Sequence, residues 1–313
     1  RSVIYLKFSC SRPELYEIVS NVSRAVSGKT SLAVLEGILI RAKGDTLSFL
    51  GYDLDLGISA QMGAQVEEEG EIVLSAKLFV DMMRRMNGDT VTVRTDEKYL
   101  TEIKSGATEF TILGIPSDEF PEIPVVQEEQ SISLPQHLLK SMIDQTLFAI
   151  STNDSKPVHT GSLFQLEAGE LRVVSVDGFR LALRREKVSA EGTAQFIIPG
   201  KTLSEMNKLL SDDKEEQTRL YLSRKHVVVQ IGQYKVISRL LEGEFLDYKA
   251  AIPEGSKTTV TVEVRPLIDS IERTSLLISD RLKSPLRIHF GEGQIKMSCS
   301  TAIGKAYDQL ECR

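Results

Sequence analysis

The sequence predicts an α+β protein built from repeated domains, in which largely antiparallel sheets carry two helices on one side of each domain. Three observations favour this fold class. A pattern of apolar runs recurs about every 125 residues along the 313-residue chain. Strand-like runs outnumber helical runs. Consecutive strands are separated by turns of hairpin length, at Gly44-Asp45, Ala168-Gly169 and Glu292-Gly293.

Each period holds two units, and each unit predicts one strand, one helix and three further strands. The first unit predicts a strand at 3–9 and a helix at 12–26, whose apolar residues are spaced three and four apart. Ser11 and Glu14 have the spacing of a capping box, in which the serine caps the first turn and the acidic residue reaches back to it. Three strands are expected at 37–43, 46–51 and 54–61.

The second unit of the first period predicts a strand at 71–74 and a helix over 76–86 that Ser75 caps. Asn87-Gly88 is expected to stop this helix in the left-handed conformation that such residues tolerate. The methionines of the helix have helical spacing with its other apolar residues, which indicates a core position rather than an adaptable binding surface. They are Met82, Met83 and Met86. Further strands are expected at 90–94, 99–104 and 108–113.

The second period repeats this order. Its first helix, at 135–150, is predicted to open with a second capping box formed by Ser133 and Gln136. The other elements are a helix at 200–210 and strands at 131–134, 162–167, 170–176, 179–186, 195–198, 219–222, 226–231 and 235–240. Two pairs of markers define the period. Asp53 and Asp177 lie at equivalent turns 124 residues apart, and Phe120 and Phe245 lie in equivalent connectors 125 residues apart.

A third copy begins with a predicted strand at 258–264 and continues with a helix at 265–283 and strands at 286–290, 294–300 and 305–311. The domains are therefore expected at 1–125, 126–251 and 252–313. By the repeat, the last range is the first half of a third domain whose full period would extend to about residue 370.

Composition is typical of a soluble globular protein, with 41% hydrophobic and 26% charged residues and a net charge of −6. No apolar run is long enough to span a membrane, and the first residues lack the pattern of a signal peptide, so the cytosol is the expected compartment. Cys10, Cys299 and Cys312 are too sparse for a disulfide framework or a metal site and are interpreted as small buried apolar residues.

The motifs do not predict catalysis. His137, His159, His226 and His289 lack metal-ligand spacing, so neither a metal nor a cofactor is predicted. Asp53 and Asp177 have the residue type of a catalytic carboxylate pair. Their equivalent places in repeated turns favour a structural role, in which each carboxylate accepts backbone N–H groups.

Charge is unevenly distributed between helices and strands. The five helical segments carry a net charge of +4 against −6 for the chain, which leaves −10 for the rest. A helical layer that faces phosphates inside an acidic layer of strands would produce this asymmetry. Ordinary solvated helix faces are the alternative explanation.

Several runs resemble the bacterial β sliding clamp family, the processivity subunit of DNA polymerase III. They are Lys7-Phe8, Glu119-Phe120-Pro121, and residues 32–39 (LAVLEGIL), 50–55 (LGYDLD), 176–182 (VDGFRLA) and 241–248 (LEGEFLDY). The resemblance implies a non-catalytic, cytoplasmic bacterial DNA clamp with the sheets outside and the helices inside. It also implies a head-to-tail ring homodimer around double-stranded DNA, bound without regard to base sequence. The implied partners are the polymerase III catalytic subunit, the clamp loader and other proteins with clamp-binding motifs.

The resemblance assigns residues to three sites. Toward DNA it places Lys29, Lys77, Asn153, Lys156 and Lys201. A partner-peptide groove between the second and third domains is assigned His159, Val176, Gly178, Phe179, Arg180, Leu181, Leu246, Ala250 and Ala251. The dimer joint is assigned Phe110, Leu276 and Leu277. The chain departs from the family pattern at His159, often apolar there, and at Ala250, which can be arginine; the segment that closes the groove would follow Arg313.

Two other classes of protein remain open from the residues alone. One is a strand-rich scaffold or adhesin that does not bind DNA, from which one-sided basic helices and retention on DNA would distinguish a clamp. The other is a polynucleotide-processing enzyme, which would require turnover dependent on a divalent metal.

Overall fold

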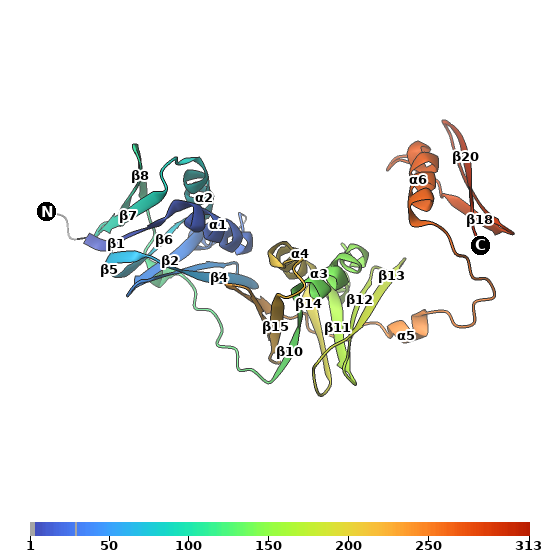
Figure 1. Ribbon diagram of the computed structural model, residues 1–313, viewed down its shortest axis with the longest axis horizontal. Coiled ribbons are helices and arrows are strands. Elements are labelled where there is room, and N and C mark those ends of the chain that lie inside the picture. The colour runs from blue at the N-terminus through green and yellow to red at the C-terminus, as the bar shows by residue number, and fades with distance from the viewer. Residues whose placement is uncertain (1–3, 29) are drawn as a thin grey trace. The chain divides into compact units, whose positions relative to one another are not determined.

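The computed structural model describes residues 4–28 and 30–313 and divides the chain into two compact units. The first unit runs to Tyr248 and the second from Lys249 to Arg313. Within the first unit, Figure 1 shows helices α1 to α4 on one side of the sheets. This is the α+β arrangement that the sequence predicts.

The first half of unit one contains two helices and nine strands. In order they are β1 (Ile4–Ser11), α1 (Arg12–Val22), β2 (Gly37–Lys43), β3 (Thr46–Tyr52), β4 (Leu56–Gly63), β5 (Gln65–Glu68), β6 (Gly70–Ser75), α2 (Ala76–Arg85), β7 (Thr90–Asp96), β8 (Leu100–Ser105) and β9 (Thr108–Leu113). Strand β5 is absent from the sequence prediction, and short 3-10 turns follow α1 and precede β2.

The second half repeats this order without a counterpart of β5. Its elements are β10 (Gln130–Pro135), α3 (Gln136–Asp144), β11 (Gly161–Glu167), β12 (Glu170–Val176), β13 (Leu181–Lys187), β14 (Ala194–Pro199), α4 (Gly200–Leu209), β15 (Gln217–Leu222), β16 (His226–Ile231) and β17 (Tyr234–Arg239). Helix α3 is shorter than predicted, because a 3-10 turn at Leu147–Ala149 continues the chain after it.

Unit two is small. The short helix α5 (Tyr248–Ala251) lies at the boundary, and α6 (Val264–Thr274) leads through a 3-10 turn at Ser275–Leu277 to β18 (Arg287–Gly291), β19 (Gln294–Thr301) and β20 (Gly304–Glu311). These three strands form one antiparallel sheet in sequence order.

Unit one contains three sheets, and one of them joins its two halves. Their strand orders are β5-β1-β7-β8-β9, β10-β15-β16-β17-β4-β3-β2-β6 and β13-β12-β11-β14. In the eight-stranded sheet, β4 of the first half pairs antiparallel with β17 of the second. All described pairings are antiparallel, as hairpin connections require.

Strand register repeats with the period that the sequence predicts. Leu39 faces Leu50 across β2 and β3, and the residues 124 positions later, Leu163 and Val174, face each other across β11 and β12. The hairpin turns at Gly44, Gly169 and Gly293 all have positive φ angles, which glycine adopts without steric cost.

Two of the predicted serine caps are confirmed and one is wrong. The Ser11 and Ser75 side chains accept hydrogen bonds from the backbone N–H groups of Glu14 (3.4 Å) and Leu78 (3.5 Å). Ser133 does not cap α3, because β10 continues through it to Pro135. The buried side chain of Gln136 instead contacts the start of β15, where its Nε2 donates to the Gln217 carbonyl (3.1 Å).

The predicted left-handed stop at Asn87-Gly88 is also wrong. Helix α2 ends at Met86 in an extended conformation, with φ −69° and ψ 145°. The Arg12 guanidinium donates to the carbonyls of Met83 (2.7 Å) and Gly88 (2.6 Å). A side chain from α1 therefore satisfies a terminal carbonyl that a left-handed turn would otherwise have to satisfy.

The strand predicted at 258–264 does not form. Thr261 exchanges backbone hydrogen bonds with Arg313 (2.6 and 2.9 Å), and α6 begins at Val264. Strands β1 and β10, at the equivalent places, pair with β7 and β15 from the second half of their own periods. Unit two, which is described throughout, holds no such strand, so this segment lacks a neighbour to pair with.

Apolar side chains fill the space between the helices and the sheets. The core includes Phe8, Phe49, Phe79 and Phe164, all at most 1% exposed. The three methionines of the α2 region are also buried, which confirms that they belong to the core. Cys10 and Cys299 are buried, whereas Cys312 is partly exposed. Burial raises the pKa of the Cys10 thiol to about 12, so the thiol stays protonated at neutral pH.

Candidate functional sites

Two of the predicted DNA-facing lysines occupy equivalent positions on two helices. Lys77 lies in the first turn of α2 and Lys201 in the first turn of α4, 124 residues later. Both side chains are exposed. The helical side of unit one therefore carries one ammonium group at the same place in each half, as expected of a surface that contacts phosphates.

Asn153 and Lys156 lie in the loop between α3 and β11, and both are exposed. The Asn153 Oδ1 accepts from the Ser155 backbone N–H (2.9 Å), which leaves its NH₂ group directed elsewhere. The position equivalent to Asn153 in the first half is Lys29, which lies outside the described residues. This loop and the helix starts are distinct parts of the predicted DNA surface.

Lys201 has a second role that the sequence did not reveal. Its ammonium group contacts the carboxylate of Asp53, in the turn between β3 and β4. The Lys201 side chain remains 54% exposed, whereas Asp53 is 9% exposed. The ion pair therefore links α4 of the second half to a turn of the first half.

Other polar contacts reinforce the same joint between the halves. Asn21 on α1 donates to the Tyr234 hydroxyl (2.8 Å). Arg24, in the 3-10 turn after α1, lies 3.7 Å from Glu205 of α4. Together with the pairing of β4 and β17, these contacts hold the halves together on both their helical and sheet sides.

The turn at Asp177 has the structural role predicted for it. The Asp177 Oδ1 accepts from the backbone N–H groups of Phe179 (3.0 Å) and Arg180 (3.1 Å). These hydrogen bonds, led by that from Phe179, lower the pKa of the carboxyl. The Asp53 Oδ1 makes the same pair of bonds with Asp55 (3.1 Å) and Leu56 (2.7 Å).

The residues after this turn point in different directions. Gly178 has a φ of 90°, and the Phe179 side chain beyond it is 99% exposed. The Arg180 side chain folds back toward the 3-10 turn after α3. It donates to Asp177 Oδ2 (2.9 Å) and to the Phe148 carbonyl (2.6 Å). Its guanidinium also lies 5.3 Å from the centre of the Phe148 ring. These contacts fix the Arg180 side chain against the 3-10 turn after α3.

The structure brings two of the predicted groove residues into one apolar cluster. Val176 is buried in it, and Leu181 packs against its margin. The other members are Val158, Leu163, Val174, Ile197, Leu241, Phe245 and Tyr248. Leu246, the residue after Phe245 of this cluster, is 46% exposed. Ala250 and Ala251 lie in unit two, so their place in the groove remains a prediction.

His159 lies at the edge of this cluster. Its ring meets the Phe245 ring edge-on, with 5.2 Å between the centroids. Burial lowers the pKa of the imidazole, and nearby Lys156 lowers it further, so the ring is neutral at neutral pH. Its buried Nε2 has no hydrogen-bond partner among the described residues. A neutral ring with one unpaired nitrogen suits the polar rim of an apolar groove.

The first half contains an equivalent apolar cluster, and at its margin the second half packs closely against β4. Tyr52 and Gly57 face each other across β3 and β4, where Val176 and Leu181 face each other across β12 and β13. A Cβ added at Gly57 would lie 2.8 Å from the Ile237 side chain of β17. Glycine therefore lets the second half pack closely there, whereas leucine occupies the equivalent place in the second half.

The three predicted joint residues lie on accessible surfaces. Phe110 is 37% exposed on β9, the edge strand of its sheet. Leu276 is 81% exposed and Leu277 is partly buried, both in the turn after α6. Phe110 belongs to unit one and the two leucines to unit two. Their contact in a dimer remains a prediction.

Repeated halves joined through a shared antiparallel sheet, with paired helices on one side, define a clamp-type α+β protein. The family model for the N-terminal domain of the DNA polymerase III beta subunit matches residues 6–124. The model for the central domain of the same subunit matches residues 133–247. The chain therefore belongs to the β sliding clamp family.

Relatives and solved structures agree with this family. The beta sliding clamp of Bacillus subtilis is 35% identical over 97% of this chain and 84% of its own length. A crystal structure of the Bacillus subtilis clamp has a TM-score of 0.93 at 32% identity, covering 98% of this chain and 84% of that one. The clamp of Bartonella birtlesii bound to griselimycin has a TM-score of 0.92 at 28% identity and the same coverages.

The family settles the class of activity. The chain is a sliding clamp, a processivity factor of DNA replication without catalytic activity, so the alternatives of a repeat scaffold and a processing enzyme are wrong. No helix in the described part of the chain is long and apolar enough to cross a membrane. Sequence reasoning missed Asn21, Arg24 and Glu205, because contacts between residues about 180 positions or more apart leave no local pattern.

Proposed function

We propose that the chain is one subunit of a ring-shaped homodimer that encircles double-stranded DNA in the bacterial cytoplasm. Each subunit has domains at 1–125 and 126–251 and a third domain that begins at 252. The ring tethers the DNA polymerase III catalytic subunit to its template and is opened by a clamp loader. Other proteins with clamp-binding motifs share the same groove.

The joint between β4 and β17 is the observation that carries this proposal. Strand β4 is the third strand after α1, and β17 is the third strand after α4. Strand β20 is the counterpart of β4 in unit two, and β9 is the counterpart of β17 in the first half. Both are edge strands of their sheets. Pairing β20 of one subunit with β9 of another would form the same joint head to tail, and the ring closes if two copies suffice.

The lysines support DNA as the occupant of the ring. Lys77 and Lys201 repeat on equivalent helix starts, and Lys156 adds a third exposed ammonium group. Lys29 and Asn153 complete the proposed set at equivalent loop positions. Contacts of this kind attract phosphates without reading base sequence, so the ring remains free to slide.

The apolar cluster of domain two supports a groove for partner peptides. Leu181 is partly exposed at the margin of the cluster that buries Val176, and it lies on the edge strand β13, whose counterpart β4 is already paired. His159 supplies a neutral polar rim, and Leu246 an exposed apolar margin. Gly178, Phe179 and Arg180 form the turn at one side, and Ala250 and Ala251 are proposed for the facing wall.

A peptide titration tests the groove. We would measure the affinity of a labelled peptide with leucine and phenylalanine anchors for the protein and for Leu181→Asp. Loss of one buried aliphatic contact removes about 1.5–3 kcal/mol, or roughly tenfold to a hundredfold in affinity. Leu54→Asp is the matched control, because Leu54 is exposed at the equivalent turn of the first half. Equal affinities for the protein and Leu181→Asp would place the groove elsewhere.

A further inference from the structure

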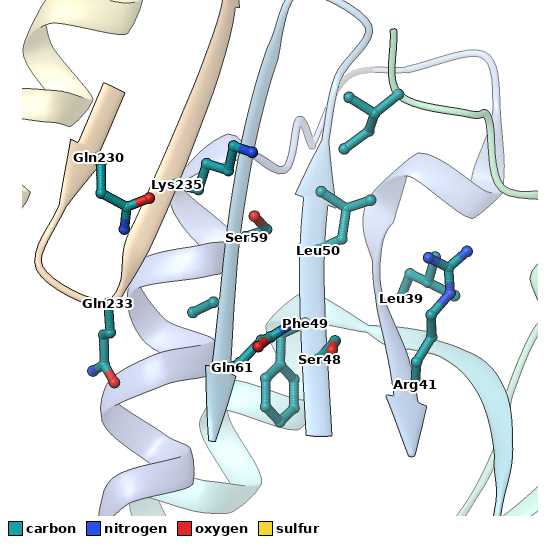
Figure 2. A pocket seen from close by; sticks show the side chains of 12 residues that line it. Leu39, Arg41, Ser48, Phe49, Leu50, Ser59, Gln61, Gln230, Gln233 and Lys235 are labelled. Atoms are coloured by element: carbon teal, nitrogen blue, oxygen red, sulfur yellow. The ribbon is translucent and has the colours of Figure 1, made fainter. Parts of the chain in front are cut away.

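A hollow of about 430 Å³ lies on the face of the eight-stranded sheet that is turned away from the helices. Figure 2 shows its lining, which crosses the joint from β2, β3 and β4 of the first half to β16 and β17 of the second. Leu39 and Leu50 line one end, and Lys235 lines the other. It is separate from the groove of domain two, with which it shares no lining residue.

Strand register explains the shape of this hollow. Leu39 faces Leu50, Leu50 faces Ser59, and Ser59 faces Lys235, so four side chains form one row across the joint. Ser48 lies in the next row, opposite Arg41. The side chains of Ser48 and Ser59 are short, so the hollow is deepest between the two leucines and Lys235.

The second half shows what fills the same place there. Leu163 and Val174 are the counterparts of Leu39 and Leu50, and the buried Tyr248 belongs to the same apolar cluster as both of them. The Tyr248 hydroxyl lies 2.6 Å from Gln165 Oε1, to which it donates a hydrogen bond. In the first half the residue equivalent to Tyr248 is Ile123, 125 positions earlier, which has neither ring nor hydroxyl. Leu39 is 3% exposed and thus as covered as Leu163, whereas Leu50 is only partly buried and its counterpart Val174 is fully buried. The space that the smaller residue leaves open therefore lies over Leu50.

The charges of the hollow are positive. Arg41 and Lys235 are the charged residues among those that line it. Arg41 already pairs with Glu71 (2.9 Å). Lys235 has no carboxylate partner in the part of the chain that the structure describes. The hollow thus combines an unfilled site for a ring with an exposed ammonium group, in a protein whose net charge is −6.

We propose that this hollow is a second docking site, which binds an extended peptide segment of a partner protein. The peptide places an aromatic side chain over Leu50 and an acidic side chain against Lys235. Leu50 and Lys235 lie two strand spacings apart, ~10 Å, which about three residues of extended chain span. The aromatic and acidic residues are therefore separated by about three positions.

Display of random peptides on phage tests this proposal. A library of about nine-residue peptides, long enough to cover the hollow, is selected on the full chain and then depleted on Ile123→Tyr. That substitution supplies the ring that Tyr248 supplies in the second half, so it fills the hollow from within. The peptides that remain are expected to carry an aromatic residue and an acidic residue about three positions apart. No remaining peptides, or peptides without the acidic residue, would overturn the proposal.

Affinities of the selected peptides distinguish the two docking sites. Fluorescence polarisation should show binding that is roughly fivefold weaker to Lys235→Glu, as expected for an exposed ion pair replaced by repulsion. Lys98→Glu, an exposed lysine in the β7–β8 turn, is the matched control and should bind normally. Leu181→Asp should also bind normally. Loss of binding in that variant would assign the peptides to the groove of domain two instead, and this outcome would reject the hollow while leaving the proposed groove intact.

Discussion

Gly57→Leu should weaken the joint between the two halves of unit one. Gly57 lies on β4 opposite Ile237 of β17, and a Cβ at this position would come within 2.8 Å of the Ile237 Cγ2 and 3.3 Å of the Tyr52 ring. Ile237 is β-branched, so its methyl group cannot move away without changing a restricted side-chain torsion. The equivalent residue of the second half is already leucine, which shows that the strand itself accepts this side chain.

The magnitude follows from overpacking. Forcing extra methylene groups into a packed contact costs about 1–3 kcal/mol, whereas replacing glycine in a strand returns roughly 0.5–1 kcal/mol of backbone entropy. Gly63→Leu on the same strand is the control. It shares the gain in backbone entropy but not the packing cost, because a Cβ at Gly63 has no neighbour closer than 4.0 Å. The difference in the free energy of unfolding between the two variants should therefore be about 1–3 kcal/mol.

Urea unfolding followed by circular dichroism measures this difference. Gly57→Leu should unfold at lower urea than the unchanged protein, and Gly63→Leu at slightly higher urea. Hydrogen exchange should increase at the amides of β17 that pair with β4 in the first variant alone. If both variants unfold together, the glycine is not required by packing at the joint, and the contrast between a closed first half and an open second half is incorrect.

Three further predictions concern the proposed sites. Changing Lys77 and Lys156 to glutamate should weaken retention on circular DNA to a similar degree for any base sequence and lower its dependence on salt, and unchanged retention would exclude them from the DNA surface. Changing Leu276 and Leu277 to aspartate should give monomers by sedimentation, because a charge buried in an apolar joint is left unpaired; a mutant that stays dimeric would exclude these leucines. Burial lowers the pKa of His159, so the ring becomes charged only below its ordinary range, and affinity for a peptide in the proposed groove should fall as the pH drops below that lowered pKa. His159→Phe should remove that pH dependence, and a dependence that persists would assign it to another group.

The repeat and its turns were predictable from the sequence because they are local patterns. A structural role in equivalent turns was expected for Asp53 and Asp177, and each carboxylate accepts two backbone N–H groups. The strand ranges follow the alternation of buried and exposed residues that periodicity detects. Four predicted ranges coincide with observed strands: 37–43 with β2, 108–113 with β9, 170–176 with β12 and 226–231 with β16.

The errors arise where a distant segment overrides a local signal. Ser133 has the spacing of a cap, but its strand is held in register by β15 from 80 or more residues away. The segment at 258–264 has strand composition, yet a strand requires a partner, and the structure offers it only Arg313. Likewise, nothing near Lys201 in the sequence indicates Asp53, which lies 148 positions earlier.

Differences between the two halves explain how one framework provides both a closed joint and exposed apolar surfaces. On the strands that correspond, Gly57 accommodates Ile237 in the first half, whereas Leu181 remains at the margin of an apolar cluster beside an unpaired edge. In the connectors that follow Phe120 and Phe245, the second half is the more closed one. Tyr248 covers its sheet, whereas Ile123 leaves the sheet of the first half partly open. The backbone registers of the two halves match, so these contrasts arise from side chains and from the pairing of β4, which β13 lacks. Exchanging residues between equivalent positions therefore separates the contribution of the side chains from that of strand pairing.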